Sequence, residues 1–143
     1  MPLSADLRAA TVTLLTDYAA SAGVKLQVYR ARPASIYAPT AFVDGFSERV
    51  TYPGSTLYQR QPLVEVIVVH AIFDSGEAVD QRDAFVDGFL AYCATRFHQA
   101  GANTLLGLVA IDDLPAFVPD WLPPEKQKTY YASRITLEGL SQT

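Results

Sequence analysis

The run PLVEVIVVHAIF (residues 62–73) decides the fold of this chain of 143 residues. It is rich in β-branched residues, and its apolar side chains fall on both faces of an extended backbone. That pattern is typical of a strand covered on both sides, because a solvated strand alternates apolar and polar residues. We therefore predict that this run is the central strand of a sheet, with Pro62 limiting where a neighbour can pair.

The segments before this strand predict its hairpin partner. SERVTY (47–52) reads as a strand, and a Pro-Gly turn signal follows it. We expect a long hairpin whose turn lies near residues 53–56. Residues 31–47 hold two prolines, yet they are too apolar for a solvated loop, so we expect them to be buried against the chain's own core or a partner.

Two segments carry apolar residues at helical spacing. Residues 5–22 predict the first helix. Residues 77–99 predict the second, with an aromatic i, i+4 row that includes Cys93. Gly88 inside this second helix costs about 1 kcal/mol relative to alanine, and a close approach to the sheet would explain it.

Three further strands complete the predicted fold, at residues 24–30, 104–111 and 128–140. Helices and strands do not alternate strictly along the chain. We therefore predict an α+β fold, with a mainly antiparallel or mixed β-sheet, two main helices packed on it and a long β-hairpin. Residues 1–143 are expected to form a single domain.

The hexapeptide AFVDGF occurs twice, at residues 41–46 and 84–89. The ten residues on either side of the two copies share no identity at the 43-residue offset. A structural repeat carries a whole supersecondary unit, so we interpret the match as chance. The second copy lies in a helical pattern and the first follows two prolines, so we expect the two copies to differ in structure.

The composition narrows the classes of function. Half of the residues are apolar and the formal net charge is −4, which indicates a globular chain and argues against a dedicated nucleic-acid binder. The single cysteine excludes an internal disulfide and fits a reducing compartment. No apolar run reaches the length of a membrane span, and we expect no secretory signal at the N-terminus.

The candidates for catalysis each have a plainer interpretation. His70 lies inside the central strand with no Ser, Cys or Asp spaced locally to pair with it, which favours a hydrogen-bonded or interface histidine over a general base. Cys93 lies on the apolar row, where a thiol packs as a small hydrophobic group. Asp80, Asp83 and Asp87 could offer oxygens to a hard cation, but acidic residues early in a helix also offset its dipole.

No glycine-rich phosphate loop, nucleophile elbow or HExxH helix is present in the sequence. We therefore predict no catalytic residue, no metal site and no cofactor. An enzyme using His70 or the three aspartates of the second helix is kept as an alternative from a different class, and a monomeric binding module as a third.

The charges are distributed unevenly along the chain. Residues 30–60 carry a net +2, and residues 74–87 carry a net −4. These are either two solvated surfaces or two patches that meet between neighbouring copies. In the second case Arg49 and Arg60 are the favoured cationic contacts. The full set of predicted interface residues is Arg30, Arg32, Arg49, Arg60, Asp80, Asp83, Asp87, Phe117 and Trp121.

The proline-rich segment 112–125 contains the last two of these residues. Phe117 and Trp121 are large apolar groups among loop-forming residues, and such groups are favoured in interfaces. They form either a docking surface for partners or a lid over the chain's own core.

Three blocks of sequence, taken together, resemble tail terminator proteins of long-tailed (siphovirus-type) bacteriophages. They are RQPLVEVIVV (60–69), EAVDQRDAFVDGF (77–89) and PDWLPPEKQKTYYASRITLEGL (119–140). The blocks keep the same order, from about residue 48 onward. The resemblance rests on this order and not on a catalytic motif.

The resemblance implies a small α/β protein that forms a homo-hexameric ring on the head-proximal end of the tail tube. The ring would stop polymerisation of the major tail tube protein and offer a surface to a head-completion or connector protein. It implies no enzyme activity and no cofactor, DNA that only passes through the lumen, no membrane, and a place in the virion after assembly in the host cytoplasm. The alternative within this class is another head-tail joining or tail-completion protein.

Overall fold

The computed structural model describes residues 3–52, 59–72, 76–96 and 104–141. The elements, in chain order, are α1 (Leu3–Ala22), β1 (Gln27–Tyr29), β2 (Thr40–Thr51), β3 (Gln59–Ile72), α2 (Ala78–Arg96), β4 (Thr104–Phe117), a 3₁₀ turn (Pro124–Lys126) and β5 (Tyr130–Ser141). This is an α+β fold with two main helices, as the sequence predicts.

The strands form one mixed sheet in the order β1-β2-β3-β5-β4. β1 runs parallel to β2, and every other neighbouring pair is antiparallel. β3 lies in the middle, which confirms the predicted central strand for residues 62–72, and residue 73 lies outside the described residues. Its pairing with β5 begins at Leu63, the residue after Pro62, so the missing N–H of the proline falls just beyond that ladder.

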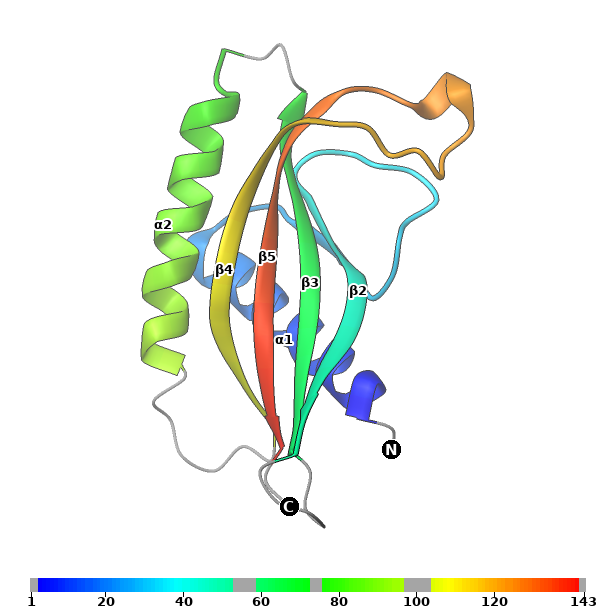
Figure 1. The fold of residues 1–143 in the computed structure, drawn as a ribbon. Helices are drawn as coiled ribbons and strands as arrows, with labels where there is room; N and C mark the ends of the chain where they lie inside the picture. The colour runs from blue at the N-terminus through cyan, green and yellow to red at the C-terminus, as the bar shows by residue number, and fades with distance from the viewer. Residues whose placement is uncertain (1–2, 53–58, 73–75, 97–103, 142–143) are drawn as a thin grey trace.

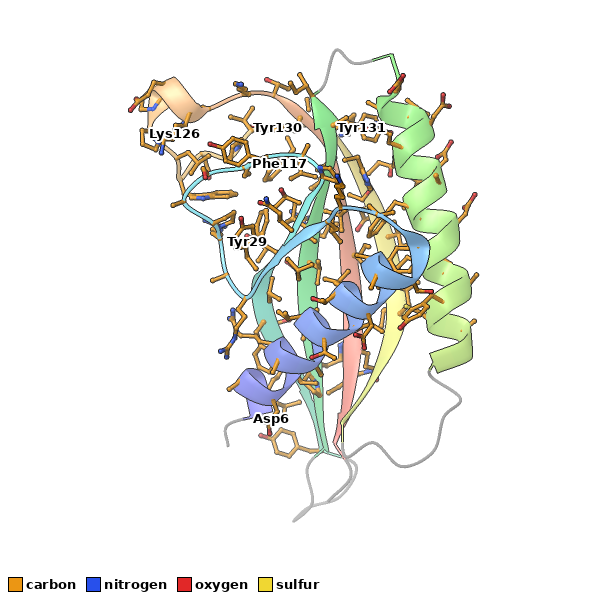
Figure 2. All side chains as sticks on the ribbon, turned by 180° about the vertical axis from the view of Figure 1, so that it is seen from behind. Asp6, Tyr29, Phe117, Lys126, Tyr130 and Tyr131 are labelled. Atoms are coloured by element: carbon orange, nitrogen blue, oxygen red, sulfur yellow. The ribbon has the colours of Figure 1, made fainter. Side chains whose placement is uncertain are left out.

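Both helices pack on the same face of the sheet (Figure 2). Leu7, Leu15 and Tyr18 of α1 join Phe89 of α2 in one buried cluster. The sheet contributes residues that point to this face, Val64, Val66, Val68, Ile135 and Leu137 among them. Removing side chains of this size from water supplies about 1.5–3 kcal/mol each, which is why the two amphipathic helices are held here.

The opposite face of the sheet is covered by chain segments at one end only (Figure 1). Ile36 and Leu122 are buried there over Phe42, Ile67 and Val69. Two connections therefore supply the second layer of the core, residues 30–39 and residues 118–129. The expectation that the segment from residue 31 buries itself against its own core is confirmed for Ile36.

The largest differences from the predicted strand boundaries concern β1, β2 and β4. β2 begins at Thr40 and not at residue 47, because residues 40–43 pair with β3 on one side and residues 40–42 with β1 on the other. This pairing outweighs the nearby prolines. β1 is shorter than predicted, since residues 24–26 lie outside the strand and contribute Leu26 to the packing of the first cluster.

β4 extends to Phe117, past the predicted end at residue 111. Its pairing with β5 continues through Leu114 and resumes at Phe117. Pro115 lies in the register shift between these two residues, where its missing N–H breaks no ladder bond. The predicted hairpin turn near 53–56 and the helix end at 97–99 lie outside the described residues.

The prediction that Gly88 allows a close approach to the sheet is wrong, because another element approaches it. The group that approaches Gly88 closely is the side chain of Tyr18 on α1, not the sheet. A Cβ built on Gly88 would overlap the Tyr18 hydroxyl, which donates a hydrogen bond of 3.2 Å to the carbonyl of Phe85. The glycine therefore lets the two helices pack together.

Candidate assembly interface

The two edges of the sheet, β4 and β2, are flanked by different structures at the same end of the strands. Ile72 at the end of β3 pairs with Tyr130, and Tyr130 pairs with Phe117 at the end of β4. The connection 118–129 and the start of α2 therefore lie at this one end. Figure 1 shows α2 on the side of β4, whereas residues 30–39 and 118–129 project on the side of β2. We call these two projecting segments the arm.

Trp121 holds the arm together. Its indole N–H donates to the carbonyl of Pro33 at 2.8 Å, and its ring meets Phe42 edge-on at a centroid distance of 5.3 Å. The guanidinium of Arg32 lies 4.9 Å from the centre of the same ring, within the range of a cation–π contact. Arg32 also donates to Asp44 at 2.8 Å. Trp121 is thus half-buried and ties both segments to β2.

Phe117 and Trp121 pack together over the second cluster at a centroid distance of 6.1 Å. This position accounts for both residues as a lid over the chain's own core. The predicted docking role concerns their remaining exposed surface and stays a prediction.

The outer surface of the arm carries cationic side chains. Arg30, Lys126 and Lys128 are all exposed, and Lys126 lies in the 3₁₀ turn at the tip of the arm (Figure 2). Within residues 30–39 and 118–129, four cations stand against Asp120 and Glu125, a net +2. One of the four, Arg32, is already paired with Asp44. The arm is therefore mildly basic.

The start of α2 presents the opposite charge. Asp80, Asp83 and Asp87 are all exposed. Arg82 donates to Asp113 at 2.8 Å and to Asp83 at 3.0 Å, and these hydrogen bonds raise the pKa of its guanidinium. Asp113 comes from β4, so the ion pairs join the helix to that strand. What remains exposed at this end of α2 is acidic.

Arg49 and Arg60 lie at the other end of the sheet. Arg49 is exposed and pairs with Gln61, and Val50 pairs with Arg60. The side chain of Arg60 lies outside what the structure describes. The structure therefore separates these two arginines from the arm. Their predicted contact with the start of a neighbour's α2 stays a prediction that requires copies displaced along the strands.

His70 is buried and hydrogen-bonded, the interpretation that the sequence favoured. Its Nε2 lies 2.9 Å from Oγ of Ser133 on β5, and its ring meets Phe85 of α2 at a centroid distance of 5.6 Å. Burial, helped by the charge of Arg82, lowers the pKa of His70 to about 4. The imidazole is therefore neutral at physiological pH.

Sequence reasoning missed Ser133 as the partner of His70. The two residues are 63 positions apart, and a register shift between Val69 and Ala71 sets His70 outside the regular ladder. No local spacing in the sequence marks such a pair.

The pair does not form an accessible nucleophile and base. Ser133 is 0% exposed, so a substrate carbonyl has no route to its hydroxyl. A pocket of about 730 Å³ lies beside His70, between the end of α1, the start of α2 and the part of the arm at residues 36–39. Its lining includes His70, Phe85 and Lys128, is mostly apolar, and does not include Ser133.

Cys93 packs in the first cluster with 2% of its surface exposed, as predicted for a small hydrophobic group. Burial raises the pKa of its thiol to about 12, so the thiolate required of a nucleophile is not formed near neutral pH.

Within the described ranges, no group of three or more His, Cys, Asp or Glu side chains is placed to hold a metal ion. Neither described helix combines the length and apolar character that a membrane crossing requires.

Comparison of the chain with protein-family models and with curated proteins returned no match.

Proposed function

We propose that this chain is a structural phage protein that forms a ring capping the tail tube, ends polymerisation of the tube and provides the head-attachment interface. The observation that carries the proposal is the basic tip of the arm and the acidic start of α2, which lie on the β2 side and the β4 side at the same end of the sheet. Two different patches on one subunit give a head-to-tail contact, which forms a ring when the rotation from copy to copy closes. The resemblance to tail terminator proteins supports the same conclusion.

In the proposed ring, the arm of one copy contacts the start of α2 of the next. Lys126 and Lys128 on the arm face Asp80 and Asp87 on the neighbour. Opposite charges of this kind set the orientation and partner of a contact more than its strength. Exposed apolar groups supply most of the affinity of the contact. Tyr37 on the arm, which is 69% exposed, is one of them.

The partners follow from the position of such a ring. One rim contacts the major tail tube protein and the other a head-completion or connector protein, and the ring resides in the virion. DNA passes through the lumen without being held, which fits a chain with a net charge of −4, since a strongly basic wall would bind phosphates.

Native mass spectrometry with negative-stain microscopy tests the proposal. We expect the wild-type chain to form a closed ring of six copies. The double variant Asp80→Lys/Asp87→Lys is expected to be a folded monomer, because like charges would then face the arm. Adding Lys126→Glu and Lys128→Glu restores the opposite charges and should restore the ring.

The matched control is Asp17→Lys, which reverses an exposed aspartate on α1 and should leave the ring intact. A wild-type chain that stays monomeric at the highest reachable concentration would refute the proposal. Mixing the ring with tail tubes and with filled heads separates a terminator from another joining protein. A terminator arrests tube growth before any head is added.

A further inference from the structure

Part of β2 has a free outer edge. β1 pairs only with Thr40, Ala41 and Phe42 of this strand. From residue 43 to residue 51, the described part of the chain supplies no strand on the outer side of β2. Unpaired backbone N–H and C=O groups on such an edge are ready to accept another strand.

β4 is the free edge on the other side of the sheet. It follows β5 in the strand order, and no described strand lies beyond it. Exposed edges are commonly protected by charges, prolines, bulges, short length or a covering helix. α2 lies on the side of β4 (Figure 1). The half of β4 at residues 104–111 has the sequence TLLGLVAI, which contains no charge and no proline. Val109 in this half is 53% exposed.

The charges and the proline of β4 are confined to its other half, whereas the uncharged half carries only a register shift at Val109. Asp112, Asp113 and Pro115 all follow the uncharged run. An uncharged strand of this length, left open, is prone to pair with other chains. The uncharged half of β4 therefore has the composition of a covered strand.

The free parts of the two edges lie at the same level of the sheet. Ser47 on β2 pairs with Leu63, Leu63 pairs with Glu138, and Glu138 pairs with Gly107 on β4. Asp112 is likewise level with Phe42, because Asp112 pairs with Arg134, Arg134 with Ile67, and Ile67 with Phe42. At Phe42, β1 covers the edge of β2. The uncharged half of one edge thus matches the uncovered half of the other.

The strand directions also match. β2 is antiparallel to β3, β3 to β5, and β5 to β4, so β2 and β4 run in opposite directions. Copies that repeat around an axis roughly parallel to the strands keep one orientation. The β4 of one copy would then meet the β2 of the next as an antiparallel pair, which is the pairing used in most of this sheet.

We infer that residues 104–111 of one copy pair with residues 43–51 of the next, so that the sheet continues from subunit to subunit. The occupant of each edge is a second copy of this chain. This inference rests on the proposed ring and adds to it a second contact, on the same two sides as the arm and α2. The continuous sheet would close both edges at once.

Hydrogen–deuterium exchange tests the pairing directly. Exchange is compared between the wild-type ring and the monomeric Asp80→Lys/Asp87→Lys variant. We expect amides in peptides from 104–111 and 43–51 to exchange at least about tenfold more slowly in the ring. A ring that forms while both peptides exchange as in the monomer overturns the inference and leaves the proposed function standing.

A charge placed on the edge gives a second test. Val109 lies in a register shift and pairs with no residue of β5, so Val109→Lys should leave the monomer folded. It should weaken the ring by at least about tenfold in dissociation constant, because a lysine protects an edge from pairing. Thr13→Lys, an exposed position on α1, is the matched control and should have no effect. A ring unaffected by Val109→Lys contradicts the inference.

Cross-linking fixes the register. In a Cys93→Ala background, Ser47→Cys combined with Gly107→Cys should give covalent oligomers with a short bifunctional thiol reagent, and neither single variant should do so beyond a dimer. Protection of 104–111 that arises only after tail tube protein is added overturns the inference, since the edge would then belong to that partner. The absence of any ring removes both the proposed function and this inference.

Discussion

The two copies of AFVDGF are the same six residues in two different structures. The copy at 41–46 is part of β2, and the copy at 84–89 is part of α2. In the strand, Ala41 and Val43 face the helices, whereas Phe42 faces the opposite cluster with Trp121. A period of two therefore divides the hexapeptide between both layers of the core.

In the helix, the same residues serve a single layer. Phe85, Val86 and Phe89 all join the first cluster, at the i, i+1 and i+4 positions of one helical face. The aspartate and glycine also change their roles. Asp44 pairs with Arg32, whereas Asp87 is exposed. Gly45 borders a register shift of β2, whereas Gly88 leaves room for the side chain of Tyr18.

The difference shows that the hexapeptide sequence alone does not determine whether it forms a strand or a helix. β2 forms because residues 40–42 are held between β1 and β3, and α2 forms because its flanking residues extend the apolar row on one face. Propensity is a weak preference that tertiary packing overrides. Equivalent substitutions in the two copies should therefore have unequal effects.

The largest contrast is expected at the sixth residue. Phe89 is 0% exposed, and Phe89→Ala should lower the free energy of unfolding by about 3–5 kcal/mol through lost burial and a cavity. Phe46 is only half-buried, so Phe46→Ala should cost about 2 kcal/mol or less. Urea unfolding of both variants measures the two values. Equal losses would contradict the description of the two environments.

Acid should destabilise the docking of the helical copy on the sheet. His70 packs against Phe85 and has a pKa of about 4 when folded, against about 6.5 when unfolded. Its contribution is fully present above pH 6.5 and is lost as the pH falls toward 4, because the unfolded chain binds the proton more readily. The loss is about 3 kcal/mol at the lower end.

Urea midpoints at pH 7, 5.5 and 4 measure this dependence. His70→Gln should show a flatter profile over the same range, since glutamine does not titrate there. A wild-type profile no steeper than that of the variant would show that His70 is not held neutral by the fold.

Substitution of the two glycines by alanine should change the stability by different amounts. Alanine normally favours a helix by about 1 kcal/mol over glycine. Gly88→Ala should instead cost about 1–3 kcal/mol, because the new Cβ overlaps the hydroxyl of buried Tyr18. At Gly45 the nearest atom to a Cβ is Oε2 of Glu65 at 3.5 Å, an ordinary contact. Gly45→Ala should therefore change the stability by less than about 0.5 kcal/mol.

Thermal or urea unfolding of the two alanine variants measures both changes in stability. The combination Gly88→Ala/Tyr18→Phe removes the overlapping hydroxyl and should recover part of the loss. A stabilised Gly88→Ala variant would mean that α1 and α2 are farther apart than described.

The smallest contrast is expected at the aspartates. Asp44→Asn removes the charge that pairs with Arg32, a half-exposed partner, and should cost no more than about 1 kcal/mol. Asp87→Asn should change the monomer by less than about 0.5 kcal/mol, since Asp87 is exposed. Its expected effect is a ring that dissociates at lower salt, which sedimentation at increasing ionic strength would detect. A larger loss of monomer stability at Asp87 than at Asp44 would contradict the assignment of these two roles.

The sequence predicts the parts of the fold that depend on local pattern. β3 carries apolar residues on both faces, and Phe85, Phe89 and Cys93 repeat at helical spacing, so both elements are recognised directly. The start of β2 and the end of β4 are not, because they depend on partners far along the chain. The prolines near them signal a break that the ladders override.

The candidate interface was also predictable from the sequence only in part. Charge counts along the sequence identify a basic and an acidic segment, but they do not show that Arg32 is engaged by Asp44 or that Arg49 lies far from the arm. The pairing of His70 with Ser133 and the matching free edges of β2 and β4 arise from strand order alone. Such features are set by topology, which no single segment encodes.

The ring itself is tested most directly by the mass of the assembled wild-type chain in native mass spectrometry, over a series of protein and salt concentrations. The proposed head-to-tail contact predicts one closed species of six copies at low salt, and a larger monomer fraction at low protein concentration as salt rises. A chain that remains a monomer at every concentration and at low salt would contradict it.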